Sequence, residues 1–276
     1  MNVYTDFAFL DSGTGGLPYM AALKEKIPHA TFAYLGDTRN FPYGEKSVEE
    51  VTECASKAIE LILSKWNPRT LVIACNTISV TSLDSLRKRF PELPIVGTVP
   101  AIKLAASFTK NKRIGLLATN ATVNNPYCRR LEEDFASDCQ VISRGDPELI
   151  DFIEHDLFTS TEEEKIKAVM PALTFFKKEK CDTIILGCTH FTHLAEVIQK
   201  AAGDEIKVVD SRDGVANQAL RLLNSEKALP QMEVSDKGVS HLKSGAFYVT
   251  AADKAQEKEY EILCRNMKIA WGGVIL

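Results

Sequence analysis

The sequence lacks any run of apolar residues that approaches the roughly 20 needed for a membrane-spanning helix. It also lacks the basic stretch and apolar core of a secretory signal, because residues 1–6 read MNVYTD. Positive charge is not in excess, since 33 Lys and Arg residues stand against 37 Asp and Glu residues, for a net charge of −4. Nucleic acids and anionic lipids attract basic surfaces. We therefore expect a cytoplasmic protein that binds neither nucleic acid nor membranes.

A linker rich in Pro, Gly or Ser is missing as well, so composition alone does not divide the 276 residues into parts. The nearest candidate is Ser225–Ser244, a polar stretch that we interpret as a surface excursion. Hydrophobic residues make up 45% and charged residues 25% of the chain, which are ordinary values for a folded protein. The length fits one large domain or two of modest size.

No C-x-x-C pair occurs among the seven cysteines, so neither a zinc ribbon nor a thioredoxin-type redox site is indicated. Their number is odd, and a chain of this length does not need disulfides to fold. Five are expected to be buried, reduced thiols that act as small hydrophobic groups, namely Cys54, Cys128, Cys139, Cys181 and Cys264. Cys75 and Cys188 differ because of the residues around them.

Short apolar runs alternate along the chain with longer helical patterns. The runs Leu71–Ala74 and Thr183–Leu186 show no alternation with polar residues, which is typical of strands buried on both faces of a parallel sheet. The other predicted strands are Phe7–Leu10, Thr31–Leu35, Ile95–Val99, Ile114–Ala118, Gln140–Ser143, Lys207–Val209 and Phe247–Thr250. Predicted helices include Val48–Ser64, Val80–Phe90, Glu162–Lys178, Ala195–Ala202 and Val215–Leu223. This order predicts a doubly wound α/β fold, in which ligands bind at the carboxyl ends of the strands.

Two octapeptides resemble each other. Thr70–Thr77 reads TLVIACNT and Thr183–His190 reads TIILGCTH, which places their cysteines 113 positions apart. A weaker match at an offset of 108 pairs Asp11 with Thr119, each after an aliphatic strand. The two matches predict a duplicated α/β unit with Cys75 and Cys188 at equivalent strand ends. A reaction that removes a proton from one face of a carbon and returns it on the other needs two such bases.

The turn DSGTGG at residues 11–16 has neither the lysine of a P-loop nor the G-x-G-x-x-G spacing of a dinucleotide site. Its backbone N–H groups are suited to a carboxylate, although the turn is equally compatible with Asp11 or Ser12 as an ordinary helix N-cap. The long loop at residues 36–47 mixes charged and aromatic residues, as functional loops and plain surface turns both do.

Each of the two special cysteines ends a predicted buried strand just before a helix start. A helix N-terminus lowers the pKa of a thiol from its reference value of about 8.5. His190 is placed to act as an acid, base or orienting group beside Cys188. The C-x-H-x-x-H pattern that includes His193 leaves a metal site as a lesser alternative, without a fourth ligand. Glu154 and His155 by themselves are typical of a solvated helix face.

These motifs together resemble the glutamate racemases, which belong to the cofactor-independent aspartate/glutamate racemase superfamily. The matching segments occur in that family's order within residues 7–211. They are DSG-x-GG at 11–16, GDT at 36–38, PYGEKS at 42–47, ACNT at 74–77, GLLAT at 115–119 and LGCTHF at 186–191. Ile78 and Val80, and the pair Thr192–His193, depart from the family's usual residues beside the site.

The resemblance implies two α/β domains that face each other across a cleft. The first comprises residues 1–98 with 210–276 and carries Cys75, and the second comprises residues 99–209 and carries Cys188. It implies that the catalytic residues are Cys75, Cys188, Asp11, His190 and Glu154. The implied substrate-binding residues are Asp11, Ser12, Tyr43, Gly44, Asn76, Thr77, Thr119, Thr189 and His190.

The resemblance also implies the reaction, in which the two thiols interconvert L- and D-glutamate and supply D-glutamate for peptidoglycan. It implies no cofactor and no metal, and a homodimer is expected. Three alternatives stay open at this stage. Aspartate racemisation would use the same thiols, a thiol hydrolase or acyl transferase would use Cys188 with His190 and leave Cys75 idle, and a non-catalytic module would only bind an acidic amino acid.

Overall fold

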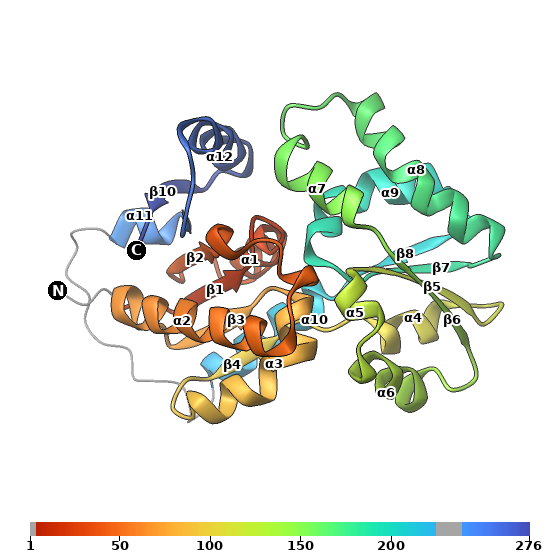
Figure 1. The fold of residues 1–276 in the computed structure, drawn as a ribbon, viewed down its shortest axis with the longest axis horizontal. Helices are drawn as coiled ribbons and strands as arrows, with labels where there is room; N and C mark the ends of the chain where they lie inside the picture. Colours follow the sequence, from red (N-terminus) through yellow and green to blue (C-terminus); the bar gives the residue numbers. More distant parts are fainter. Residues whose placement is uncertain (1–3, 225–238) are drawn as a thin grey trace. The chain divides into compact units, whose positions relative to one another are not determined.

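The computed structural model describes residues 4–224 and 239–276, and these divide into two compact units (Figure 1). Unit 1 contains the described residues up to Thr98 and those from Arg212 onward, and unit 2 is Val99–Ser211. Most of Ser225–Ser244, the predicted surface excursion, lies outside the described residues. Each unit has its own parallel sheet.

Unit 1 is built on a six-stranded sheet with the order β10-β9-β2-β1-β3-β4. Its strands are β1 (Phe7–Asp11), β2 (Phe32–Gly36), β3 (Thr70–Ile73), β4 (Ile95–Gly97), β9 (Ala246–Val249) and β10 (Ala270–Val274). Its helices are α1 (Leu17–Lys26), η1 (Thr38–Asn40), η2 (Tyr43–Glu45), α2 (Val48–Trp66), α3 (Asn76–Arg89), α10 (Arg212–Leu223), α11 (Val239–Lys243) and α12 (Lys254–Met267), where η marks a 3-10 helix.

Unit 2 is built on a four-stranded sheet with the order β6-β5-β7-β8. Its strands are β5 (Arg113–Ala118), β6 (Gln140–Gly145), β7 (Thr183–Leu186) and β8 (Lys207–Val209). Its helices are α4 (Ile102–Phe108), α5 (Asn120–Val123), α6 (Pro126–Phe135), α7 (Pro147–His155), α8 (Glu162–Lys178), η3 (Thr189–Leu194) and α9 (Ala195–Ala202).

The two sheets share one topology. When the strands of each unit are counted from its own first strand, both sheets contain the order second, first, third, fourth, and every pairing is parallel. The predicted α/β fold class with parallel sheets is therefore confirmed. The units change over between Ser211 and Arg212, two residues after the position expected from the sequence.

The inner strands β1, β2, β3 and β7 are buried along their whole length, so side chains on both of their faces are covered. In unit 1, Ala8 and Leu10 belong to the core cluster that includes residues of α2 and α3. Phe7 and Phe9 alternate with them, and their rings stack on those of Phe32 and Tyr34. This arrangement explains the uninterrupted apolar runs that marked the strands in the sequence.

The C-terminal segment extends the sheet of unit 1. β9 pairs with β2, and β10 pairs with β9 across a register shift between Trp271 and Gly273. β10 was not predicted, because its sequence AWGGV contains two glycines and no polar alternation. A Cβ at Gly272 would lie 2.3 Å from the Tyr248 ring, so close packing of β10 on β9 requires a glycine there.

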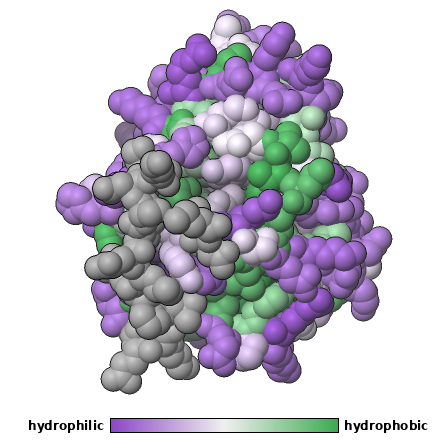
Figure 2. Space-filling model, turned by 90° about the vertical axis from the view of Figure 1, so that its left-hand side faces the viewer, coloured by the Kyte–Doolittle hydropathy of each residue, from purple (hydrophilic) through white to green (hydrophobic). Residues whose placement is uncertain are grey.

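Figure 2 shows the hydropathy of one face of the molecule. In the view of Figure 2, hydrophilic residues dominate the rim and hydrophobic side chains gather toward the middle. Exposed apolar residues at the C-terminal end include Val274 and Leu276. Among the described residues, no helix is long and apolar enough to cross a membrane.

We predict that Gly115→Ala destabilises unit 2 by about 1–3 kcal/mol, the usual cost of overpacking. The new Cβ on β5 would lie 2.5 Å from Cδ1 of Phe176, whose fully buried ring on α8 has no room to move away. Urea unfolding followed by circular dichroism measures the change.

The matched control is Gly214→Ala on α10, where a Cβ would meet nothing within 4 Å. That variant is expected to gain up to about 1 kcal/mol, because alanine favours a helix more than glycine does. Equal stability of the two variants would contradict the packing argument.

Candidate active site

Cys75 and Cys188 occupy equivalent positions at the carboxyl ends of the two sheets. In unit 1 the last ladder bond runs from the Ala74 N–H to the Leu10 carbonyl (2.8 Å), and in unit 2 it runs from the Gly187 N–H to the Leu117 carbonyl (2.7 Å). Each cysteine is the next residue along the chain. In each unit it therefore stands where the third strand leaves the first, the place where doubly wound sheets bind their ligands.

The same ladder corrects the weaker sequence match. Leu10 pairs with Ile73 and Leu117 pairs with Leu186, so Leu10 is the counterpart of Leu117. Asp11 then corresponds to Ala118, and Ser12 corresponds to Thr119, one position away from the predicted alignment. The sequence comparison had matched polar residues, whereas the hydrogen-bond register decides which residues are equivalent.

The backbone around the two cysteines is also alike. Both are N-cap residues in extended conformation, with φ −138° and ψ 118° at Cys75 and φ −126° and ψ 137° at Cys188. Neither side chain makes a cap hydrogen bond, and both residues are buried, at 5% and 4% exposure. The following helices differ, because Cys75 precedes the 14-residue α-helix α3 whereas Cys188 precedes the six-residue 3-10 helix η3.

Three predicted binding residues of unit 1 are buried close to Cys75 in sequence or in the sheet. Asn76 and Thr77 form the first turn of α3, and Ser12 follows β1, the neighbour of β3. Both polar atoms of the Asn76 amide are buried without a hydrogen-bond partner in the protein. An unpartnered buried amide costs free energy, so this side chain is suited to a polar ligand.

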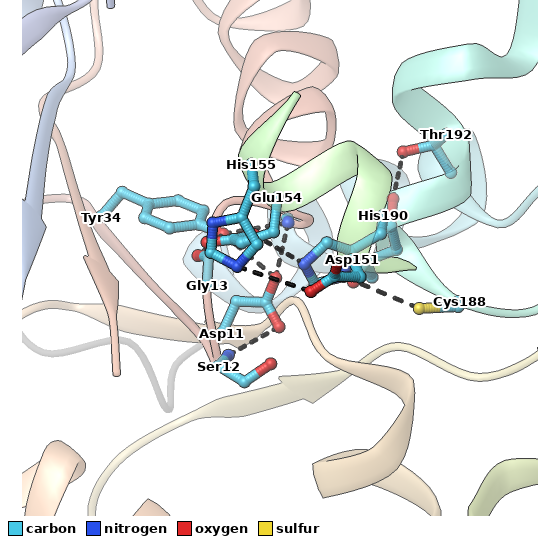
Figure 3. Close-up of polar contacts among 12 residues, drawn as sticks. Asp11, Ser12, Gly13, Tyr34, Asp151, Glu154, His155, Cys188, His190 and Thr192 are labelled. Carbon is cyan, nitrogen blue, oxygen red and sulfur yellow. Dashed lines mark hydrogen bonds and ion pairs between the residues drawn. The ribbon is translucent and has the colours of Figure 1, made fainter. Parts of the chain in front are cut away.

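Asp11 closes the glycine-rich turn (Figure 3). Its carboxylate accepts the N–H groups of Ser12 (2.7 Å) and Gly16 (2.7 Å) and contacts the Tyr34 hydroxyl (3.3 Å). The N-cap of α1 is Gly16, with no side-chain cap bond, so the alternative of Asp11 or Ser12 as N-cap is wrong. We also expected the N–H groups of this turn to bind a ligand carboxylate. The N–H groups of Ser12 and Gly16 already donate to the Asp11 carboxylate, so fewer are available to a ligand.

Tyr43 and Gly44 lie in η2, on the loop that follows β2. Tyr43 is 1% exposed, and its hydroxyl donates a hydrogen bond to Asp37. Burial and the neighbouring Asp37 carboxylate raise the pKa of Tyr43 far above its ordinary value, so the phenol stays protonated. Asp37 and Tyr34, which hold the two loops of unit 1, were not assigned a role from the sequence, although Asp37 belongs to the GDT motif.

In unit 2, Cys188 shares a buried polar cluster with His190 and Glu154 (Figure 3). His190 Nδ1 lies 3.7 Å from the Cys188 Sγ, and its Nε2 lies 2.9 Å from a Glu154 carboxylate oxygen. Burial opposes the charged imidazolium, but the contacts with Cys188 and Glu154 outweigh it and raise the pKa of His190 well above its usual value. Glu154 is therefore not on a solvated face, although its neighbour His155 is exposed and contacts Asp151.

The other residues of unit 2 singled out from the sequence are Thr119, Thr189 and His193. Thr119 caps α5 by accepting the Thr122 N–H (3.0 Å), and Thr189 is 1% exposed. The ring of His193 packs edge-on against Phe158. In the part of the chain that the structure describes, no group of three or more His, Cys, Asp or Glu side chains is suited to a metal ion.

The other five cysteines are free thiols with raised pKa values. Burial raises the pKa of Cys128 to about 12, of Cys181 to about 11 and of Cys264 to about 12. Cys54 and Cys139 were expected to be buried but are only half-buried, and burial still raises their pKa values. Thiols of this kind are poor nucleophiles and bases at neutral pH.

Comparisons with known proteins place this geometry in a family. The protein-family model described as Asp/Glu/Hydantoin racemase matches residues 19–219. A glutamate racemase from Treponema pallidum is 35% identical over 270 residues, which cover 98% of this chain and 96% of that protein. One from Proteus mirabilis is 40% identical over 228 residues, which cover 82% of this chain and 78% of that protein.

Solved structures agree with the sequence matches. The crystal structure of Escherichia coli glutamate racemase in complex with L-glutamate and the activator UDP-MurNAc-Ala has a TM-score of 0.83 at 28% identity and covers 98% of each chain. A glutamate racemase isoform from Bacillus anthracis has a TM-score of 0.76 at 26% identity. The chain therefore belongs to the Asp/Glu/Hydantoin racemase family, as its motifs predicted.

Proposed function

We propose that the protein interconverts L- and D-glutamate by moving the α-proton between two thiols, and that this supplies D-glutamate for peptidoglycan. One observation carries the mechanism, namely that Cys75 and Cys188 directly follow the last ladder bond of two sheets with the same topology. A near-symmetrical reaction needs near-equivalent bases on opposite faces of one carbon. The glutamate racemases among the relatives support glutamate as the substrate.

The proposed working state holds one thiolate and one thiol. With both groups protonated no base is present, and with both ionised no acid is present, so the pair titrates as a coupled system. In each direction the thiolate removes the α-proton from one face, and the opposite thiol donates its proton to the other face. The thiol that donated ends the turnover as the thiolate, so the reverse reaction begins from the product state.

The two thiols are supported differently in this proposal. Cys75 stands at the N-terminus of α3, and a helix N-terminus stabilises a negative charge by about 0.3–1 kcal/mol at exposed sites and up to about 2 kcal/mol where partly buried. Cys188 stands before a short 3-10 helix and relies on the His190 imidazolium, which Glu154 holds in place. Moving a thiol pKa by one unit takes about 1.4 kcal/mol, which lies within the range of a helix N-terminus.

Removal of the α-proton leaves a carbanion on the substrate. Stabilising this carbanion is harder than forming the thiolate, because an amino acid α-proton is far less acidic than a thiol. We propose that polar groups stabilise the substrate carboxylate as it becomes enolate-like. Asn76 is the first of these, since its amide is buried and without a partner in the protein. Thr77, Thr119 and Thr189 are the other candidates, together with backbone N–H groups at the starts of α3 and η3.

Asp11, Ser12, Tyr43 and Gly44 are the other residues of unit 1 that we propose to bind the substrate. Asp11 is fully buried and is proposed as a catalytic carboxylate, held by the turn that it closes. The proposal also includes a cytoplasmic homodimer that needs neither cofactor nor metal, as the resemblance implies.

The decisive experiment follows L-glutamate and the enzyme in D₂O by proton NMR, with polarimetry for the D-isomer. The α-proton signal should disappear as D-glutamate forms. Aspartate in place of glutamate tests the aspartate racemase alternative, and an ester substrate tests for a burst of acyl-enzyme. Binding of glutamate without α-proton exchange would identify a non-catalytic module and overturn the proposed reaction.

We predict that Cys75→Ala and Cys188→Ala each lower racemisation by at least about 10³-fold, within the range attributed to one general acid or base. A single variant should still exchange the α-proton of one enantiomer with solvent, because one base remains. NMR in D₂O with each enantiomer therefore assigns each thiol to its face.

Cys181→Ala is the control for the thiol variants, since this buried thiol has a raised pKa and no proposed role. It should racemise glutamate at the wild-type rate. The two-base scheme fails if Cys75→Ala or Cys188→Ala does the same.

We predict that Glu154→Gln lowers the pKa of His190 and lowers kcat by roughly 10- to 100-fold. In the wild type the pKa of His190 is raised, so the charged ring and its stabilising contacts are complete below about pH 6.5 and are lost as the pH rises through the folded-state pKa. NMR titration of the histidine Cε1 protons measures it, with a His190→Gln variant to assign the signal.

Glu148→Gln is the matched control for that change, because Glu148 is an exposed glutamate on the same helix α7. It should leave both the His190 pKa and kcat unchanged. A wild-type His190 that titrates near the ordinary value of about 6.5 would refute the role assigned to the Glu154 contact.

A further inference from the structure

The C-terminal segment of unit 1 is joined by hydrogen bonds to the loop that carries Tyr43. Thr250 follows β9, and its hydroxyl donates to the Asp37 carboxylate (2.7 Å) while it accepts the Arg39 N–H (3.0 Å). The Thr250 N–H in turn donates to the Gly36 carbonyl (3.1 Å), beyond the β2–β9 ladder. The junction lies more than 200 residues from the loop along the chain, so the fold alone brings it there.

A second layer of bonds closes the same junction. The Thr38 hydroxyl donates to the Ala251 carbonyl and accepts the Ala251 N–H (3.0 Å). The Arg39 guanidinium donates to the Thr250 carbonyl (3.3 Å). Both residues of η1 that precede Asn40 are therefore tied to the two residues that follow β9. The loop has little regular structure of its own, only the two 3-10 turns η1 and η2, so these bonds fix where it starts.

Asp37 connects Thr250 to Tyr43, which lies on the loop at residues 37–47. One carboxylate oxygen accepts the Thr250 hydroxyl, and the other accepts the Tyr43 hydroxyl and the Asn40 amide (2.8 Å). Asp37 is 3% exposed, Thr250 is 8% exposed and Tyr43 is 1% exposed. A buried carboxylate needs its hydrogen bonds, because leaving one unmade costs the full desolvation of the group. The chain Thr250–Asp37–Tyr43 is therefore a stiff connection.

We propose that Thr250 and Asp37 are positioning residues, through which the C-terminal segment sets the affinity of the enzyme for its amino acid substrate. This inference rests on the proposed function, in which Tyr43 and Gly44 belong to the substrate site. Neither Thr250 nor Asp37 touches the reacting atoms. Their loss displaces the loop that binds substrate and leaves the two thiols in place, so binding suffers more than the proton transfer.

The test compares KM and kcat for Thr250→Val, which keeps the shape of the side chain and removes both hydrogen bonds of the hydroxyl. We expect KM for glutamate to rise about tenfold, the size of effect typical of a lost hydrogen bond to a charged group, while kcat falls less than about threefold. Thr250→Ser keeps the hydroxyl and should restore KM to within about twofold of the wild type.

Thr31→Val is the matched control. The Thr31 hydroxyl also donates to a carboxylate, that of Asp6 (3.0 Å), and also accepts a backbone N–H (2.8 Å), but at the amino end of β2, away from the proposed site. It should lower thermal stability about as much as Thr250→Val does and leave KM unchanged. If Thr250→Val does not fold, Thr38→Val cuts the same junction from the loop side and gives the same comparison.

The outcomes separate the two hypotheses. Equal KM values for Thr250→Val and Thr31→Val, or a Thr250→Ser variant that fails to restore KM, overturn the positioning role. A wild-type enzyme that does not turn over glutamate overturns the proposed substrate instead. The positioning role is then judged by the same KM comparison with the amino acid that the enzyme does turn over.

Discussion

The parallel pairing of the first strand with the third in each unit is the constraint on which the site depends. It joins β1 to β3 and β5 to β7, and both ladders end one residue before a cysteine. The chains that leave the two strands diverge at this point, so the sheet opens there. A shift of one residue in either register would turn the thiol to the other face of its sheet. The core packing that sets the strand register therefore also sets the position of each thiol.

The two thiols are equivalent in backbone and unequal in surroundings. Cys75 precedes a full α-helix, whereas Cys188 precedes a 3-10 helix and is paired with a buried imidazole and carboxylate. The shared strand end follows from the shared strand order, and the different helices after it give each thiol a different environment. In the proposed reaction each thiol acts as the base in one direction and as the acid in the other, while the groups around it stay the same. Its two half-reactions are therefore expected to respond differently to pH.

The sequence was sufficient for the strands that are buried on both faces and for the cysteines at their ends, because apolar runs and their polar successors are local signals. The burial of Glu154 could not be predicted from its neighbours in the sequence. The helix pattern around it indicates a solvated face, and only the packing of α7 against η3 brings it to 2.9 Å from His190. β10 was missed for a similar reason, since its glycines make sense only against the Tyr248 ring of the neighbouring strand.

The glycine–aspartate motifs near the N-terminus also have a tertiary origin. A Cβ at Gly36 would lie 2.8 Å from the Gly13 carbonyl, and the Asp37 N–H donates to the Asp11 carbonyl (2.8 Å). The turns after β1 and β2 are thus packed against each other, and each is held by a buried carboxylate. Glycine-rich turns of this kind suggest an anion site when they are read alone. Here the anions are the protein's own. Asp11 accepts the N–H groups of Ser12 and Gly16, and Asp37 accepts the hydroxyl of Tyr43.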